Sequence, residues 1–150
     1  MKEGCEKFLS GKITIPSKDK NGRYATAIGD FRKNTNITHV YLLPDSKCKI
    51  LGTNAGGSGG FNNMSNLTLL YLPENLTSLE IINDNCFLND VKLKNIMNLP
   101  STVKYIGQSA FAQCGQLELT KLPDSIEYIG IGAFLYCQSI TLESFPPKYT

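Results

Sequence analysis

The chain repeats itself. Residues 99–114 read LPSTVKYIGQSAFAQC and residues 122–137 read LPDSIEYIGIGAFLYC, so the second stretch copies the first after 23 positions. The elements Leu-Pro, Tyr-Ile-Gly, Ala-Phe and a final Cys recur at the same offsets. A fixed period of about 20–50 residues is typical of a solenoid, in which each unit buries its apolar face only against its neighbours. This repetition constrains the fold more than any other feature.

Earlier copies of the unit are marked by a proline that follows an apolar residue. The last two intervals between these prolines are 23 residues, and the earlier ones are 28, 29 and 27. The prolines are Pro16, Pro44, Pro73, Pro100, Pro123 and Pro146. One phenylalanine falls in each unit, at Phe31, Phe61, Phe87, Phe111 and Phe134. We therefore predict about five stacked units.

The longer early units contain insertions, which we place between the phenylalanine and an aliphatic residue six positions after the proline. These aliphatic residues are Ile50, Leu79, Ile106 and Ile129. In the second unit the insertion is the Gly-, Ser- and Asn-rich loop 52–66, and in the third it falls within residues 81–86. The predicted columns place Phe111 over Phe134, Ile106 over Ile129, and Leu99 over Leu122 over Phe145.

Each unit contains two short apolar segments. One ends at the proline, as in residues 67–73, 117–123 and 140–146, and the other follows it, as in 101–107 and 124–130. Val, Ile, Leu, Thr and Tyr dominate both segments, which favours short strands. The proline ends the first strand because it lacks the N–H that a sheet ladder needs. The residues around Ala-Phe are expected to form a single helical or 3₁₀ turn that inserts Ala and Phe into the core.

These features divide the chain into three parts. Residues 1–10 form an N-terminal extension, residues 11–98 are degenerate repeats or an N-terminal cap with the insertion loop 52–66, and residues 99–150 are regular repeats of which the last is incomplete. Solenoids generally need a polar end cap, and none follows Phe145. The chain is then either a fragment, or is closed by Pro146-Pro147, or forms a homo-oligomer or larger assembly through its C-terminal end.

The pattern L-P-x-S-[IV]-x-x-I-G-x-x-A-F-x-x-C-x-x-L describes residues 99–117 and 122–140, with Thr102 in place of Ser in the first copy. It resembles the BspA-type leucine-rich repeat of bacteria, protozoa and bacteriophages. The resemblance is closest over residues 99–146 and weakens toward the N-terminus. It implies a repeat solenoid of BspA-type leucine-rich repeats of about 23 residues, with short β-strands, loops and single helical turns.

The same resemblance carries the expectation about function. Proteins similar to this one are mostly surface-associated and take part in adhesion or cell–cell contact, and related runs occur in phage tail and fibre proteins. It therefore implies a non-enzymatic interaction module that recognises a protein or a glycan, as part of a cell-surface adhesin or a phage virion appendage. The alternative is a structural spacer in a larger particle, without an external ligand. A cell-surface, extracellular or virion location follows, although the N-terminus MKEGCEKFLSGK is no signal peptide.

Composition and motifs argue against other classes of protein. The net charge is +2 and the 15 Lys and Arg residues are scattered, whereas nucleic-acid-binding proteins usually carry a basic patch. No apolar run approaches the ~20 residues of a transmembrane helix, so no membrane insertion is expected. The only histidine is His39 and no Cys-x-x-Cys pair occurs. We therefore expect no metal, no cofactor and no catalytic residues.

The chain has five cysteines. Cys114 and Cys137 occupy the same position in successive units, and we interpret them as small buried hydrophobic residues. A column of thiols one unit apart could also approach disulfide distance. Cys5 and Cys48 are expected to be exposed.

Outward strand positions suggest a contact surface. Stacking of units places Tyr105 beside Tyr128 and Lys104 beside Glu127. Tyr71 and Lys121 are two further outward residues, each one position before an apolar–Pro pair. Tyrosine is enriched at binding hot spots. The candidate ligand-facing residues are Tyr71, Lys104, Tyr105, Lys121, Glu127 and Tyr128. The alternative is that they are ordinary solvated strand residues whose cross-strand pairs stabilise the sheet.

Overall fold

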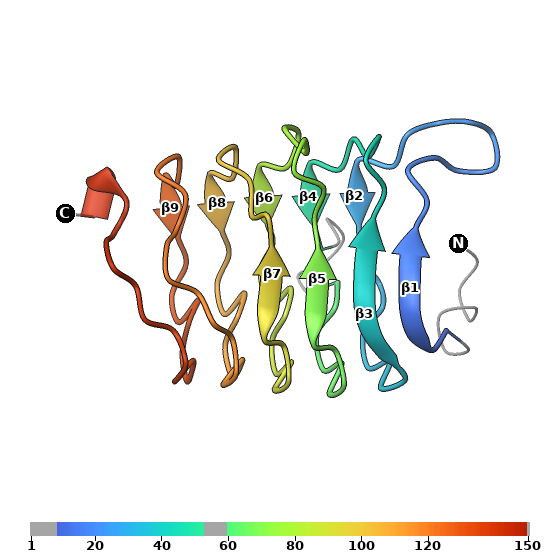
Figure 1. Ribbon diagram of the computed structural model, residues 1–150. Helices are drawn as coiled ribbons and strands as arrows, with labels where there is room; N and C mark the ends of the chain where they lie inside the picture. Colours follow the sequence, from blue (N-terminus) through green and yellow to red (C-terminus); the bar gives the residue numbers. More distant parts are fainter. Residues whose placement is uncertain (1–8, 53–59, 150) are drawn as a thin grey trace.

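A computed structural model describes residues 9–52 and 60–149 as a parallel β-solenoid (Figure 1). Each complete coil contains a strand in one sheet, a corner, a strand in a second sheet and a turn that leads to the next coil. The predicted N-terminal extension, apart from its last two residues, and residues 53–59 of loop 52–66 lie outside the described residues. The architecture confirms the predicted leucine-rich-repeat solenoid.

Two sheets run along the stack. The sheet at the front of Figure 1, here called the front sheet, contains β1 (Gly11–Ile15), β3 (Ile37–Leu42), β5 (Leu69–Tyr71) and β7 (Asn95–Met97), in that order. The sheet behind it, the back sheet, contains β2 (Ala27–Ile28), β4 (Ile50–Leu51), β6 (Ile81–Ile82), β8 (Tyr105–Ile106) and β9 (Tyr128–Ile129). A 3₁₀ helix, η2, covers Pro147–Tyr149. All paired strands are parallel, because each coil passes in the same direction as the coil before it.

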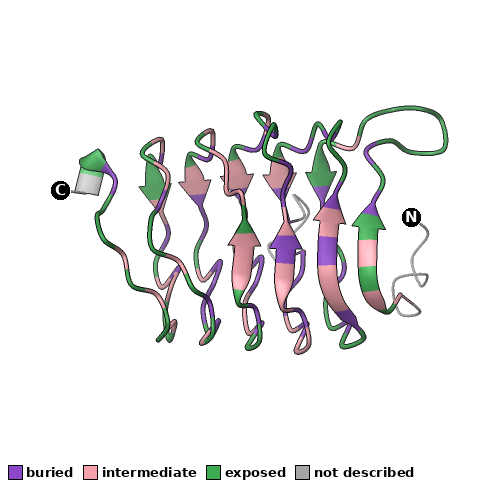
Figure 2. Ribbon diagram, in the orientation of Figure 1, coloured by how far each residue is buried: buried purple, intermediate pink, exposed green. Residues whose placement is uncertain are grey.

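Columns of equivalent residues between the two sheets form the core. The rings of Phe31, Phe61, Phe87, Phe111 and Phe134 stack one on the next, with centroid distances of 5.4, 5.2, 5.3 and 5.4 Å. The predicted pairing of Ile106 with Ile129 is also present. Figure 2 shows buried residues alternating with more exposed ones along β3 and β5, as expected for strands with one face on the core.

The register of the earlier coils differs from the predicted one. The column that contains Ile106 and Ile129 continues through Ile82 and Leu51, not through Leu79 and Ile50. The extra residues of the third unit therefore precede β6, and the prediction that they fall within 81–86 is wrong. Counting from the proline fails because Leu79 is an additional, fully buried core residue in this longer corner.

The front sheet ends at β7, although strands were predicted at 117–123 and 140–146. In place of these two strands, the described chain forms a single isolated bridge between Lys121 and Ser144. Leu70 points into the core three residues before its proline, whereas Thr120 and Glu143, at the same distance from theirs, are exposed. A polar residue at this inward position cannot keep the strand packed on the core. Phe145, predicted to lie over Leu122, is 55% exposed.

The segments around Ala-Phe form turns instead of the predicted helical turn, and η2 is the only helix among the described residues. Ala110, Phe111 and Ala133 are nevertheless buried, as predicted. The residue two positions after each phenylalanine has a positive φ, between 59° and 64°. These residues are Lys33, Asn63, Asn89, Gln113 and Tyr136. The left-handed conformation turns the chain out of each Phe segment toward the next coil.

Candidate interaction surfaces

The predicted ligand-facing residues fall into two groups on different sheets. Tyr105 and Tyr128 begin β8 and β9 of the back sheet, and Lys104 and Glu127 immediately precede them. Tyr71 ends β5 of the front sheet. Lys121 lies beyond the last strand of that sheet and lines a shallow cavity of about 370 Å³, where its Nζ is 3.8 Å from Asp124 Oδ2. The structure therefore does not bring the six residues together into one surface.

The back-sheet group forms the two predicted pairs. The Tyr105 and Tyr128 rings stack with centroids 4.7 Å apart and planes 9° apart. Lys104 Nζ lies 3.9 Å from Glu127 Oε1. The Tyr105 hydroxyl donates a long hydrogen bond of 3.4 Å to Asp84 Oδ1. Partial burial, and then the nearby Asp84 carboxylate, raise the pKa of Tyr105.

The row of the back sheet that contains these two tyrosines is otherwise aliphatic. Strand register aligns Tyr105 and Tyr128 with Ile81, Ile50 and Ala27. The tyrosine ladder is thus two residues long and sits at the C-terminal end of the back sheet. The mutual stacking and the ion pair satisfy these side chains within the solenoid, as cross-strand pairs do in other sheets.

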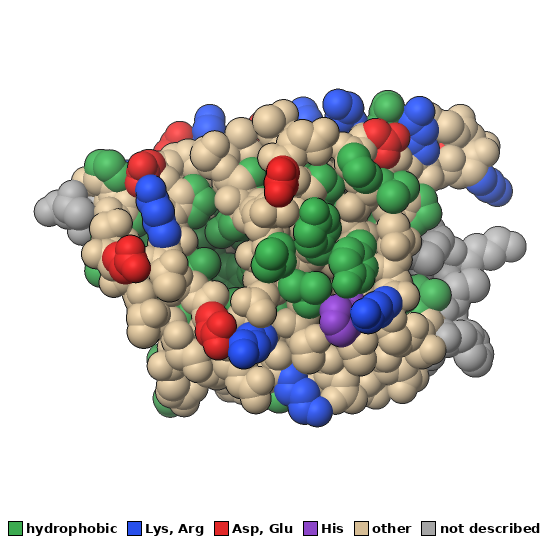
Figure 3. Space-filling view, viewed as in Figure 1, with side chains coloured by type: hydrophobic (Ala, Val, Ile, Leu, Met, Phe, Trp, Pro, Cys, Tyr) green, Lys and Arg blue, Asp and Glu red, His purple; other side chains and the backbone are tan. Residues whose placement is uncertain are grey.

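The front sheet carries a larger outward apolar surface. One outward row contains Lys12, His39, Leu69 and Asn95, and the next contains Thr14, Tyr41, Tyr71 and Met97. The Tyr41 ring lies 6.3 Å from that of His39 and 5.7 Å from that of Tyr71, centroid to centroid. Met97 is 44% exposed. Figure 3 shows hydrophobic side chains gathered over the middle of this face, with charged residues mostly around them and a hollow toward the C-terminal coils.

Sequence reasoning missed Tyr41 and Met97 because it counted backward from the proline. Both residues lie three positions before a proline, whereas Tyr71 lies two positions before its own. The additional residue in the β7 coil is Asn98, which has a φ of 61° and donates from Nδ2 to Leu72 O at 2.8 Å. Alternation around the buried Val40 would have been the better guide to which residues point outward.

The thiols are part of the core. Cys48, Cys86 and Cys114 are buried, Cys137 is half-buried, and all four are free. The prediction that Cys48 is exposed is wrong, because its position beside β4 faces inward and its Sγ donates to Ile50 O at 3.3 Å. Burial raises the pKa of Cys48 to about 11 and raises those of Cys86 and Cys114 further. Such thiols carry almost no thiolate at neutral pH and are weak nucleophiles. Cys5 lies outside the described residues.

Within residues 9–52 and 60–149, no cluster of three or more His, Cys, Asp and Glu side chains is arranged to hold a metal ion. No helix in the same part of the chain is long and apolar enough to cross a lipid bilayer. His39 lies half-buried on the outer face of β3, where its Nδ1 is 2.8 Å from Thr38 Oγ1.

Residues 54–150 match the BspA type leucine-rich repeat region in six copies. The chain belongs to the BspA-type leucine-rich repeat family. The match covers more than half of the chain and includes the coils from β5 to β9. Repeats of this family indicate a protein-interaction module. Among curated proteins, none matches the chain significantly.

Solved structures with a similar fold are bacterial leucine-rich repeat proteins. One from T. pallidum aligns with a TM-score of 0.64 and 27% identity, over 86% of this chain and 56% of its own. A protein from Eubacterium ventriosum aligns with a TM-score of 0.63 and 23% identity, over 91% of this chain and 32% of its own. One from Bacteroides ovatus has a TM-score of 0.56 and 25% identity, over 87% and 40%. The BspA-type chain thus spans about a third to just over half of these structures.

Proposed function

We propose that this BspA-type protein recognises a partner protein through the outer face of the front sheet. The observation that carries the proposal is the row formed by Tyr41, Tyr71 and Met97, with Leu69 beside it. An exposed sheet face usually carries polar residues, and contiguous apolar patches on a soluble surface mark interaction sites. Tyr and Met are enriched in the cores of protein–protein interfaces, whereas Lys and Glu are depleted there.

A protein partner suits this face better than a glycan. Glycan recognition combines aromatic rings with polar groups that pair with hydroxyls, whereas Tyr71 has Tyr41 and Met97 as its neighbours in one row and Leu69 lies next to this row on the same strand. Among the polar members of the two rows, Lys12, Thr14 and Asn95 lie on the first and last strands of the sheet, and the His39 ring on β3 stacks on that of Tyr41. This arrangement resembles the apolar core and polar rim of a protein interface.

The biological setting belongs to the same proposal. As part of a cell-surface adhesin or a phage virion appendage, the solenoid would present the front sheet to a protein on another surface. The back-sheet group of Lys104, Tyr105, Glu127 and Tyr128 would be a second, smaller contact. This setting is supported by the BspA-type repeats and by the bacterial origin of the similar solved structures.

The alternative, a spacer or assembly element, is favoured by a different observation. Several large hydrophobic side chains of the last coil are exposed, including Ile131 at 83%. The others are Leu135, Tyr136 and Phe145. A neighbouring repeat or subunit stacked on this coil would cover them. In that role the ends of the stack carry the function, and the front sheet needs no ligand.

The experiment that tests the proposal uses peptides selected from a random display library on the immobilised full chain. Selected peptides concentrate on surfaces built for binding, because hot spots accept several partners. We expect most of them to lose at least about ten-fold in affinity to the Met97→Lys variant, since a charge then enters a desolvated contact. Val91→Lys, at an exposed hydrophobic residue outside both sheets, is the matched control. Peptides that lose affinity to the control instead would contradict the assignment of the front sheet.

Light scattering on the purified chain tests the alternative role. A monomer whose front-sheet variants lose peptide affinity supports recognition through that face. A defined oligomer that Ile131→Glu converts to monomer supports the assembly role, because Ile131 would then be buried between copies.

A further inference from the structure

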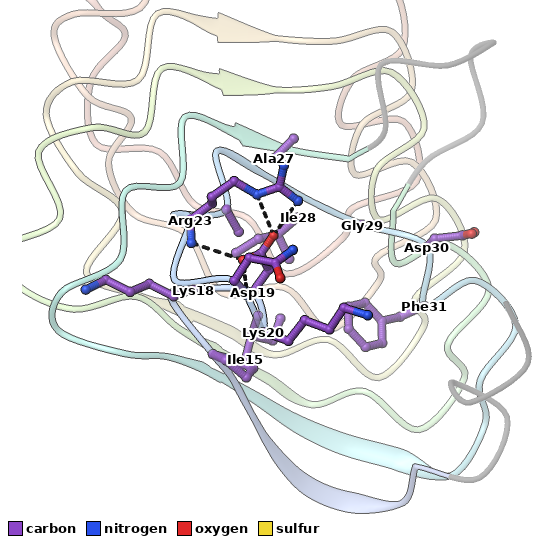
Figure 4. A pocket seen from close by; sticks show the side chains of 13 residues that line it. Ile15, Lys18, Asp19, Lys20, Arg23, Ala27, Ile28, Gly29, Asp30 and Phe31 are labelled. Atoms are coloured by element: carbon purple, nitrogen blue, oxygen red, sulfur yellow. Dashed lines mark hydrogen bonds and ion pairs between the residues drawn. The ribbon is translucent and has the colours of Figure 1, made fainter. Parts of the chain in front are cut away.

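A cavity of about 760 Å³ opens at the N-terminal end of the solenoid, beside β2 (Figure 4). One wall is the loop between β1 and β2, which Figure 1 shows extending beyond the edges of both sheets. The apolar lining comes from Ile15, Ile28 and Phe31, which end the core columns, and from Ala25 and Ala27. Its volume lies in the range of about 300–1,000 Å³ that is typical of ligand sites.

The loop that forms this wall is held in one shape. Lys18 and Tyr24 form an antiparallel bridge. Asp19 Oδ1 accepts backbone hydrogen bonds from Asn21 at 2.8 Å and from Arg23 at 3.0 Å. Asp19 Oδ2 accepts from Arg23 Nε at 2.9 Å and lies 2.8 Å from Arg23 Nη2. A wall that is ordered before binding loses little conformational entropy when a ligand enters.

The opposite wall is a strand edge. Among the described strands, β2 lies at the end of the back sheet and pairs only with β4. The carbonyls of Thr26 and Ile28 accept from Lys49 N and Gly52 N at 2.7 and 2.8 Å, on the β4 side. Backbone groups of alternate residues in a strand point to opposite edges, so the N–H and C=O of Ala27 point away from β4. In the part of the chain that the structure describes, no strand pairs with β2 on that side.

The mouth of the cavity carries an excess of positive charge, because it has more cations than anions. Lys18, Lys20 and Arg23 line it together with Asp19 and Asp30. The two acids are neutralised by arginines, Asp19 by Arg23 and Asp30 by Arg32, each at 2.8 Å. Lys18 Nζ lies 4.5 Å from the centre of the Tyr24 ring, and Lys20 has no ion pair with any described residue. In Figure 4 the Lys20 side chain lies among the lining residues, whereas Lys18 points outward.

We propose that this cavity binds an extended acidic segment of a partner protein as an additional strand on β2. The backbone of the segment would pair with the N–H and C=O of Ala27, and alternate side chains would pack on Ile15 and Ile28. Carboxylates on the other side chains would meet Lys20 and Lys18. Strand addition to a sheet edge is a recurring mode of peptide recognition. The site is separate from the front sheet and does not depend on the function proposed above.

The charge decides between the possible occupants of the edge. A second copy of this chain, paired edge to edge, would bring two loops close together, each with Lys18 and Lys20 unmatched by a carboxylate among the described residues. Repulsion between these like charges opposes the association of two copies, whereas an acidic segment is attracted to the lysines. An unpaired strand edge readily accepts another chain, so a partner with the complementary charge is the occupant that fits.

The test uses a fluorescein-labelled peptide of alternating glutamate and valine, and fluorescence anisotropy with the full chain at low ionic strength. We expect saturable binding that weakens about ten-fold in the double variant Lys18→Glu, Lys20→Glu, because two attractive contacts become repulsive. The matched control is Lys33→Glu, Lys92→Glu, which changes the net charge equally outside the cavity lining. Equal weakening by both double variants, or no saturable binding, would overturn the proposal.

Two further probes separate strand addition from attraction between charges. In one peptide the backbone nitrogens of the odd-numbered residues are methylated, and in the other those of the even-numbered residues. Only the set that faces Ala27 donates to β2, so we expect one of the two peptides to lose binding and the other to keep most of it. Equal binding of both would contradict strand addition. Met97→Lys on the front sheet should leave the affinity for the unmethylated peptide unchanged, which keeps this test distinct from that of the proposed function.

Discussion

The rings of Tyr105 and Tyr128, one coil apart on the outside of the back sheet, stack with centroids 4.7 Å apart. On the inside of the solenoid, the Phe87 and Phe111 rings stack at 5.3 Å. Neighbouring strands of a sheet lie about 4.7–4.9 Å apart, which is close to the distance at which aromatic rings stack. A residue type that is repeated at the same position of successive coils therefore packs against the same residue type, both in the core and on the surface.

The phenylalanine column predicts a large loss of stability on truncation. Phe87 is fully buried between Phe61 and Phe111, so we expect Phe87→Ala to lower the free energy of unfolding by about 3–5 kcal/mol. Phe145→Ala, at an exposed phenylalanine, is the control and should change it by less than about 1 kcal/mol. Urea unfolding followed by circular dichroism measures both. If both variants lowered the free energy of unfolding by similar amounts, the phenylalanine column would not be the main source of core stability.

A buried aspartate predicts a dependence of stability on pH. Asp90 is fully buried; its Oδ1 accepts from Met64 N at 2.8 Å, and its Oδ2 has no hydrogen-bond partner among the described residues. Burial raises the pKa of Asp90 well above its usual value, and the nearby thiols of Cys86 and Cys114 are uncharged at neutral pH. The folded state therefore holds a proton that the unfolded state releases above about pH 4.

The sign follows from this difference in bound protons. The stability of the protein falls as the pH rises from about 4 toward the pKa of Asp90 in the folded state. Asp90→Asn cannot ionise, so we expect this variant to be more stable at pH 7 and to lose the Asp90 contribution to the pH dependence. Urea unfolding of both proteins between about pH 4 and pH 8 gives the measurement. If the free energies of unfolding of the two proteins changed with pH in parallel, Asp90 would not be the cause of the pH dependence.

The left-handed turn residues predict a stabilising substitution. Tyr136 has a φ of 60° and is 63% exposed, while Asn63 and Asn89 occupy the same position in earlier coils. Residues other than Gly, Asn and Asp pay about 1 kcal/mol in this conformation. We expect Tyr136→Asn to raise the melting temperature, and Tyr136→Ala, which keeps the strain, not to raise it. If Tyr136→Ala raised the melting temperature by the same amount, the effect would come from the loss of the exposed ring and not from the backbone conformation.

The tyrosine pair predicts a measurable coupling. A double-mutant cycle with Tyr105→Ala and Tyr128→Ala should give a coupling energy of about 0.5–1.5 kcal/mol, the range of stacked aromatic pairs. The double variant should remain folded, because both side chains lie outside the core. The neighbouring ion pair of Lys104 and Glu127 is exposed, and Lys104→Met should change stability only slightly. Additive effects of the two tyrosine substitutions would contradict a stabilising stack.

The third coil follows the repeat pattern in its turn and departs from it in the corner before its back strand. From Ile82 to Phe87 the spacing equals that from Ile106 to Phe111, so the turn of this coil follows the repeat. The corner before it is longer and adds Leu79 to the core, which shifted the predicted register by several residues. A count from the proline does not reveal an insertion in a corner, because the strand that follows the corner keeps its register with its neighbours in the stack.

The last coils show the limit of pattern reasoning in another way. Residues 117–123 have the composition of a strand, yet Thr120 stands where earlier coils have an inward aliphatic residue. Alternation along the segment, more than its composition, would have separated it from β5. The same alternation places Tyr41 and Met97 on the outer face beside Tyr71.

The sequence by itself determined the coil. A repeated unit that cannot bury its apolar face alone must stack, and stacking in register brings Phe111 over Phe134 and Tyr105 over Tyr128 whatever the details of the loops. Only the tertiary structure decided which residues share a face. Hydrogen bonds between coils set the register of the front sheet, and the β1–β2 loop encloses a cavity against the edge at Ala27. Both depend on corner lengths and on contacts between distant segments, which a local repeat pattern does not contain.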